Sequence, residues 1–176
     1  MKKSDEINLG EISDHKIKIV NLSKTKRQMS ELKKYSELKQ AIDKVEEAAI
    51  SYDTPTKKIE LSRQGVSPEF VLDLMTVYQF SKQEASRLTD ISSKTLDRHI
   101  QSGKFFTGLQ SDRILELAEL FHEGLDVFGS QEKFLRWLSS SLPALGNTRP
   151  KDWLDTHHGI QMITDELGRI KHGIFA

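Results

Sequence analysis

Apolar residues recur at helical spacing along most of the chain. Between Arg27 and Ile50 they return every three or four residues, which places them on one face of an amphipathic helix. The steps approach a heptad repeat, so two interpretations stay open: the helix pairs with a copy of itself, or it packs against its own domain. The positions are Met29, Leu32, Tyr35, Leu38, Ile42, Val45 and Ala49.

The flanks of this helix are less regular. Residues 1–25 are polar, but an alternation at Ile17 and Ile19, with Leu9 or Ile12, predicts a short strand. A disordered arm is the alternative. Pro55 ends the periodic pattern, and residues 54–65 are predicted to form a linker.

Two short helices joined by a turn are predicted between residues 82 and 103. Ser81 and Glu84 have the spacing of a capping box, so one helix begins at Lys82 and ends near Leu88. Ser92 is the expected N-cap of the second. Such a pair is typical of a helix-turn-helix, but short helix pairs also occur in all-α proteins that do not bind DNA. The inward-facing residues are Ala85, Leu88, Ile91, Leu96 and Ile100.

Helices are predicted on both sides of this pair. One begins at Ser67–Pro68, one covers residues 111–125, and a third is capped by Ser130. Pro150 suits the start of a short helix that carries Trp153, and Gly173 is the expected C-cap of the last helix. Both tryptophans are expected in the core. The apolar positions of the third and last helices are Phe134, Leu135, Trp137, Leu138, Ile160, Ile163, Leu167 and Ile170.

Composition fits an all-α protein with a modest core. Of 176 residues, 36% are hydrophobic and 30% are charged. No run approaches the roughly 18 apolar residues of a membrane helix, and the first residues lack a signal-peptide core, so a cytoplasmic location is expected. The chain has no cysteine, which excludes disulfides and thiolate chemistry.

Charge is balanced overall and mildly uneven along the chain. Residues 1–60 carry 13 basic and 11 acidic residues, residues 61–104 carry 6 and 5, and residues 105–176 carry 7 and 10. This distribution permits a basic face toward DNA and an acidic face toward a protein, and it requires neither.

Candidate chemical sites are weak. Asp152, Asp155, His157 and His158 cluster near a helix end, but adjacent histidines point in different directions and no HxxxH or HExxH spacing is present. They are interpreted as turn and capping residues. Residues 139–141 lack a GxSxG context. We therefore expect no catalytic residue, no metal site and no cofactor. The chain is not expected to be an enzyme.

An ordered set of spaced residues runs through the last third of the chain. It comprises Val127–Phe128–Gly129, Trp137–Leu138, Pro150, Trp153–Leu154, Thr156, Gly159, Ile163, Leu167, Ile170 and Gly173. Together these positions resemble the toxin-binding domain of the Xre/MbcA/ParS antitoxins.

A second segment extends the resemblance. KQEASRLTDISSKTLDRHIQSG, residues 82–103, is similar to the Xre-type helix-turn-helix that precedes this domain in such antitoxins. It departs at Ser86, where a small Ala is usual, and at Asp90, where Gly is usual. Ser is still small, and Asp tolerates a left-handed turn. The resemblance begins at Val66.

Three parts are expected. Residues 1–65 lie outside the resemblance and form an N-terminal extension with an arm and one long amphipathic helix. The resemblance implies that residues 66–104 form an Xre-like helix-turn-helix domain and residues 105–176 a toxin-binding helical domain. The implied function is the antitoxin of a type II toxin-antitoxin system. It would cover the active site of a RES-type NAD-degrading toxin and repress its own operon. The alternative is a helix-turn-helix regulator or helical adaptor without a toxin.

Two sets of partner-binding residues follow. Reading operator DNA through one helix per half-site implies a homodimer with recognition helices about 34 Å apart. The C-terminal tail is expected to enter the toxin's site, or instead to fold back on its own core. Expected DNA-binding residues are Ser92, Ser93, Lys94, Thr95, Asp97, Arg98 and Gln101. Expected toxin-binding residues are Arg169, Lys171, His172, Gly173, Ile174, Phe175 and Ala176.

Overall fold

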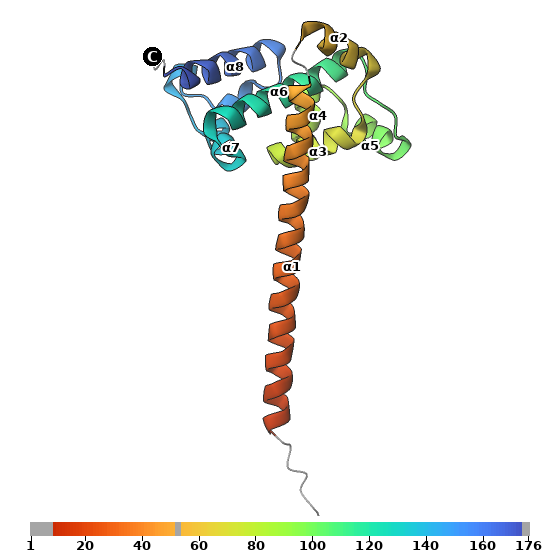
Figure 1. The fold of residues 1–176 in the computed structure, drawn as a ribbon, viewed down its shortest axis with the longest axis vertical. Helices are drawn as coiled ribbons and strands as arrows, with labels where there is room; N and C mark the ends of the chain where they lie inside the picture. The colour runs from red at the N-terminus through yellow and green to blue at the C-terminus, as the bar shows by residue number, and fades with distance from the viewer. Residues whose placement is uncertain (1–8, 52–53, 174–176) are drawn as a thin grey trace, which may run out of the picture. The chain divides into compact units, whose positions relative to one another are not determined.

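The computed structural model describes residues 9–51 and 54–173, and the side chains of residues 27–51 and 54–173. Within these ranges all regular elements are helical, which confirms the predicted all-α class. They are α1 (Leu9–Ile50), α2 (Pro55–Gln64), α3 (Pro68–Tyr78), α4 (Lys82–Thr89), α5 (Ser93–Ser102), α6 (Leu109–Phe128), α7 (Gln131–Ser139), the 3-10 helices η1 (Pro143–Leu145) and η2 (Pro150–Trp153), and α8 (His157–Lys171) (Figure 1).

The chain divides into two units, Met1–Lys39 and Gln40–Ala176. Helix α1 contributes residues to both. We describe each unit by itself and call the second the C-terminal unit. The predicted boundaries after residues 65 and 104 remain predictions.

Helix α1 begins earlier than predicted, and the strand predicted around Ile17 and Ile19 is wrong. The helix starts at Leu9, because the sequence has neither proline nor glycine between Glu11 and Thr54 to stop it. Its two described parts differ in burial. In the first unit, the side chains of Met29, Leu32 and Tyr35 are exposed. In the C-terminal unit, Ala41, Val45 and Ala49 are buried, so this end of the helix packs against its own unit.

Residues 54–65 are a capped helix, so the predicted linker is wrong. The Thr54 hydroxyl accepts from the backbone N–H of Lys57, and Pro55 occupies the first turn, where its missing N–H costs nothing. The proline that ends the α1 pattern thus begins α2. Lys58 Nζ then lies 2.6 Å from a carboxylate oxygen of Glu119, which connects α2 to α6.

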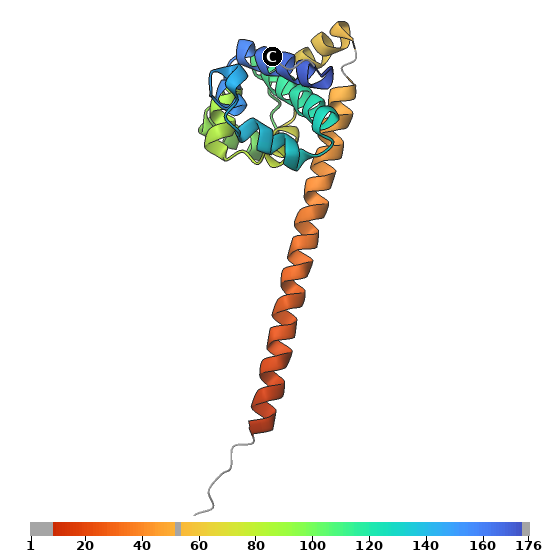
Figure 2. The ribbon, with the colours of Figure 1, turned by 90° about the vertical axis from the view of Figure 1, so that its left-hand side faces the viewer.

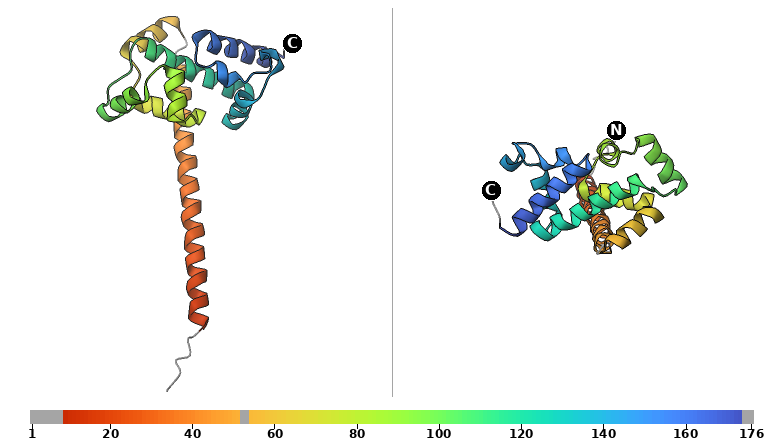
Figure 3. Two further views of the ribbon diagram at one scale, coloured as in Figure 1. Left: turned by 180° about the vertical axis from the view of Figure 1, so that it is seen from behind. Right: turned by 90° about the horizontal axis from the view of Figure 1, so that it is seen from above.

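Helix α6 forms the centre of the C-terminal unit. It contacts α2, α3, α4, α7 and α8, and views from opposite sides show these helices arranged around it (Figures 1 and 3). Its apolar positions cover more than one face, as expected for a helix with neighbours on several sides. Its buried residues are Ser111, Ile114, Leu115, Leu117, Ala118, Leu120, Phe121 and Gly124.

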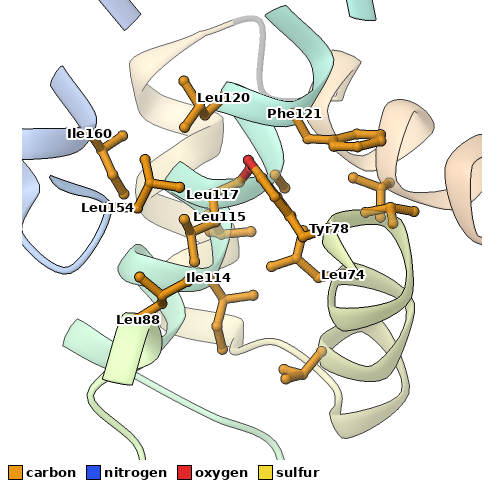
Figure 4. Packing of buried hydrophobic residues seen from close by; sticks show 14 of the residues in the cluster. Leu74, Tyr78, Leu88, Ile114, Leu115, Leu117, Leu120, Phe121, Leu154 and Ile160 are labelled. Carbon is orange, nitrogen blue, oxygen red and sulfur yellow. The ribbon is translucent and has the colours of Figure 1, made fainter. Parts of the chain in front are cut away.

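The core joins α3 to η2 and α8 through α6. Leu74 and Tyr78 approach α6 from one side, while Leu154 and Ile160 approach from the other (Figure 4). The Tyr78 hydroxyl donates to the Leu117 carbonyl oxygen at 2.7 Å. Burial raises the pKa of Tyr78 well above its usual value, so the hydroxyl stays a neutral donor.

Helices α7 and α8 pack against the C-terminal part of α6 (Figure 2). The approach of α7 depends on Gly124, because a Cβ there would lie 2.4 Å from ring carbons of Phe134. Phe134 is fully buried and contacts Tyr78, Phe121, Phe128 and Trp137 in an aromatic cluster. The small residue in α6 therefore sets how closely α7 packs.

Gly124→Ala should destabilise the protein by about 1–3 kcal/mol, because the added methyl group overpacks the Phe134 site. Gly168→Ala is the matched control, since a Cβ there meets nothing within 4 Å. In helix α8 it should stabilise the fold by about 0.5–1 kcal/mol. Urea denaturation followed by circular dichroism measures both, and similar midpoints for the two variants would contradict this account.

Candidate functional site

Helices α4 and α5 form at the predicted residues. The Ser81 hydroxyl accepts from the Glu84 N–H at 3.2 Å, and the Glu84 carboxylate accepts from the Ser81 N–H at 2.9 Å. The backbone and hydroxyl of Ser81 together lower the pKa of Glu84. Asp90 has the left-handed conformation expected of the turn, with φ 54°. The capping box and both short helices are confirmed, while DNA binding stays a prediction.

The candidate DNA-binding residues divide into two groups on α5. Lys94, Arg98 and Gln101 are exposed at spacings of four and three, and they share one face of the helix. We call these three residues the α5 stripe. The other candidate DNA-binding residues lie outside this stripe. The Ser92 hydroxyl accepts from the Thr95 N–H at 3.1 Å, Ser93 is partly buried, and Asp97 forms an ion pair with Lys82 of α4.

The inner face of α5 is fixed by an aromatic contact. The His99 ring is buried and stacks on Phe106, with 4.5 Å between ring centroids. Phe106 in turn exchanges two backbone hydrogen bonds with Val66, each 2.8 Å long. The segment after α5 is thereby joined to the segment before α3, and the α5 stripe is left on the outer side.

The candidate toxin-binding residues lie at the end of α8. Arg169 Nε donates to Glu166 at 2.7 Å, and Lys171 Nζ donates to Asp126 at 2.6 Å. This contact raises the pKa of Lys171 and lowers that of Asp126. His172 is exposed, and Gly173 has φ 68° with its N–H donating to the Ile170 carbonyl at 3.1 Å. Ile174, Phe175 and Ala176 lie outside the described residues.

The acidic and histidine cluster near α8 consists of separate contacts. Asp152 accepts two hydrogen bonds from Arg149, both at 2.8 Å, and Asp155 pairs with Arg87 at 2.9 Å. His157 Nδ1 lies 2.5 Å from a Glu116 oxygen. The three side chains turn to different elements, as expected of residues that shape a turn.

Known proteins resemble both the C-terminal third and a longer stretch of the chain. The family model for the Antitoxin Xre/MbcA/ParS C-terminal toxin-binding domain matches residues 123–173. A protein of Yersinia enterocolitica named Antitoxin Xre is 28% identical over 122 residues, or 69% of this chain and 82% of that protein. The Antitoxin Xre of Photorhabdus laumondii is 29% identical over 63% of this chain and 76% of its own length.

A third relative has a more specific name. The Prs ADP-ribosylating antitoxin of a Sphingobium species is 24% identical over 70% of this chain and 83% of its own length. All three relatives are named as antitoxins, and the domain match falls where the ordered set of residues predicted it. The chain therefore resembles the Xre/MbcA/ParS-type antitoxins, and its residues 123–173 match their toxin-binding domain. Within the described ranges, no helix combines the length and the apolarity needed to cross a bilayer.

Arg113 connects the end of α4 to the residue that follows η2. The sequence alone does not single out this residue. Its Nε donates to the Leu88 carbonyl at the end of α4 at 2.9 Å, and its guanidinium also reaches Glu116 and the Leu154 carbonyl. Only 11% of the side chain is exposed, and burial lowers its pKa. In the sequence, Arg113 is one polar residue among others in an amphipathic helix. Its role appears only when α4 and the loop after η2 meet at α6.

The predicted core position of Trp153 is wrong, because its side chain is partly exposed to solvent. It was expected in the core, but it is 41% exposed, whereas the next residue, Leu154, is fully buried. Adjacent residues on a tight turn point in different directions, so one core position can hold only one of them. Trp137 is half-buried against Phe128 and Phe134.

Replacing Arg113 with Met should destabilise the antitoxin by about 2–4 kcal/mol, because the Leu88 and Leu154 carbonyls lose a charged donor in a dry setting. Arg136→Met is the matched control. That side chain is 72% exposed and forms only an i,i+4 pair with Glu132, so its loss should change stability by about 0.5 kcal/mol or less. Chemical denaturation reports both, and equal losses would rule out the bridging role of Arg113.

Proposed function

We propose that this chain neutralises a RES-type NAD-degrading toxin by binding it through residues 123–173 and covering its active site. The match of that segment to a toxin-binding domain carries the proposal. The names of the three relatives support it, since each is an antitoxin. A binding role also suits the described geometry, in which the polar clusters hold the fold together.

The proposed toxin chemistry is compatible with the name of one relative. The Sphingobium protein is named for ADP-ribosylation, a reaction whose usual donor is NAD⁺. NAD⁺ degradation and ADP-ribosyl transfer both begin by breaking the bond between nicotinamide and ribose. Either toxin would therefore need a pocket for an anionic dinucleotide, and that pocket is the target of the proposed inhibition.

The end of α8 is the proposed inhibitory element. Its Lys171 and Arg169 are already held by Asp126 and Glu166, so their charges are positioned and partly neutralised. Gly173 turns the chain out of the helix. The three residues that follow, Ile174, Phe175 and Ala176, would enter the toxin's pocket with their apolar side chains.

Deleting Ile174–Ala176 should abolish neutralisation while leaving toxin binding in place. The test first looks for a RES-type reading frame next to the gene of this chain. It then expresses that RES-type protein together with the full-length or the truncated chain, and measures growth, cellular NAD⁺ and co-purification. The truncated chain should co-purify with the toxin but allow NAD⁺ to fall, because the domain still binds while the pocket stays open. A truncated chain that protects NAD⁺ as well as the full chain would exclude this mechanism.

A second function is proposed for the α5 stripe. Lys94 and Arg98 are exposed on the second helix of the pair, the position that enters the major groove in a helix-turn-helix. We propose that they contact phosphates of the operator of the antitoxin's own operon and that a homodimer presents two such helices. Asp97 is held by Lys82, which reduces its repulsion of the backbone phosphates.

Lys94→Ala and Arg98→Ala should each weaken operator binding and reduce the salt dependence of log K by about one unit, because each removes a phosphate contact. Lys133→Ala on α7 is the control, since it removes an exposed lysine from outside the helix pair. Gel-shift titrations at several salt concentrations give the slopes. If all three variants have the wild-type slope, the α5 stripe does not contact DNA.

A further inference from the structure

The turn η2 presents a large aromatic side chain to solvent. Trp153 is 41% exposed in a segment where Pro150 and Leu154 are both buried. Tryptophan carries more apolar surface than other side chains, so leaving it exposed forgoes a large part of the stabilisation that burial would give. This exposed indole lies inside the segment that matches a toxin-binding domain.

One hydrogen bond holds the exposed indole, and two further features fix the turn that carries it. Trp153 Nε1 donates to the Thr148 hydroxyl at 2.8 Å, which satisfies its one polar group internally. The Arg149 and Asp152 side chains form a two-point pair across the turn, with both distances 2.8 Å. Leu154, next to the indole, is anchored in the core. The free surface of the ring is therefore its apolar part.

Gly159 allows the same turn to pack on α8. A Cβ at this position would lie 1.8 Å from the Trp153 carbonyl oxygen and 2.9 Å from the Thr156 hydroxyl. Thr156 is the N-cap of α8, and its hydroxyl accepts from the Gly159 N–H at 3.0 Å. The backbone of Trp153 thus sits directly on the first turn of the helix, where only glycine leaves room for it.

We infer that Trp153 is a second anchor for the toxin, inserting its indole into an apolar pocket on the toxin's surface. The inference rests on the proposed function and deepens it. Tryptophan is enriched among residues that dominate binding energy, and a side chain held in place before binding loses little entropy when it docks. The Arg149–Asp152 pair lies in the same turn and would supply polar groups near the contact.

A single interface of standard size is wide enough to include both anchors. Helix α8 has 15 residues and is about 22 Å long, with Trp153 just before its start and the proposed inhibitory tail after its end. A standard interface covers about 800 Å² on each partner, a patch roughly 30 Å across. The indole would hold the toxin at one end of α8 while the tail covers the active site at the other.

The test measures binding of purified full-length antitoxin to the RES-type protein by biolayer interferometry. Trp153→Ala should raise Kd by about 30-fold or more, mainly through faster dissociation. Leu109→Ala is the matched control. It removes a side chain that is 86% exposed and lies outside residues 123–173, so Kd should change by less than about twofold. Trp153→Phe keeps an aromatic ring and should lose less affinity than Trp153→Ala.

The outcomes separate this inference from the function on which it rests. Thermal unfolding of each variant checks that the fold is retained, and Trp153→Phe provides the comparison if Trp153→Ala does not fold. If folded Trp153→Ala binds the toxin with wild-type Kd and dissociation rate, the second anchor is excluded while toxin binding stands. If Trp153→Ala does not fold, wild-type values for Trp153→Phe have the same meaning. If the wild-type antitoxin fails to bind the toxin, the proposed function and the anchor fail together.

Discussion

Burial of α6 on several sides is the constraint on which the C-terminal unit depends. A helix with apolar residues on more than one face is stable only when neighbours cover those faces. Helices α2, α3 and α4 cover one part, and α7 and α8 cover another. Each large side chain removed from water contributes about 1.5–3 kcal/mol. The α4–α5 pair and the matched toxin-binding segment therefore share one core.

Polar contacts determine the orientation in which these helices pack. Apolar burial is nonspecific in orientation, whereas Arg113 must reach the carbonyls of Leu88 and Leu154 at once. The nearby pairs of Arg87 with Asp155 and of His157 with Glu116 join the same elements at the surface. Exposed pairs of this kind add little stability individually, but they restrict how α4 and the start of α8 can shift.

Local signals in the sequence predicted much of this arrangement, while long-range contacts decided the rest. Ser81, Glu84 and Ser92 could be interpreted correctly because capping involves residues three positions apart. The linker predicted at Pro55 is wrong because a proline can end one helix and begin another. The strand predicted at Ile17 is wrong because a short alternation is also compatible with a continuous helix.

The site residues were harder to predict for the same reason. Lys94 and Arg98 could be placed on an outer helical face from spacing alone. Arg113 could not be singled out, because its partners are 25 and 41 positions away in the chain. The position of Trp153 on an apolar face, next to Leu154, predicted that it lies in the core. The assignment failed because Leu154 occupies the core position that the turn provides.

Under the proposed function, binding depends on how rigidly the chain presents its contact residues, and η2 is one such rigid segment. Any segment that becomes ordered when it enters an active site loses conformational entropy, and that cost must be offset by contacts elsewhere. The hydrogen bond from Trp153 to Thr148 and the close packing on Gly159 already restrict the indole in the free protein. Under the proposed function, affinity would come from this fixed aromatic contact. The tail would then need to supply only enough binding energy to stay in the pocket, because the anchored domain keeps its local concentration high.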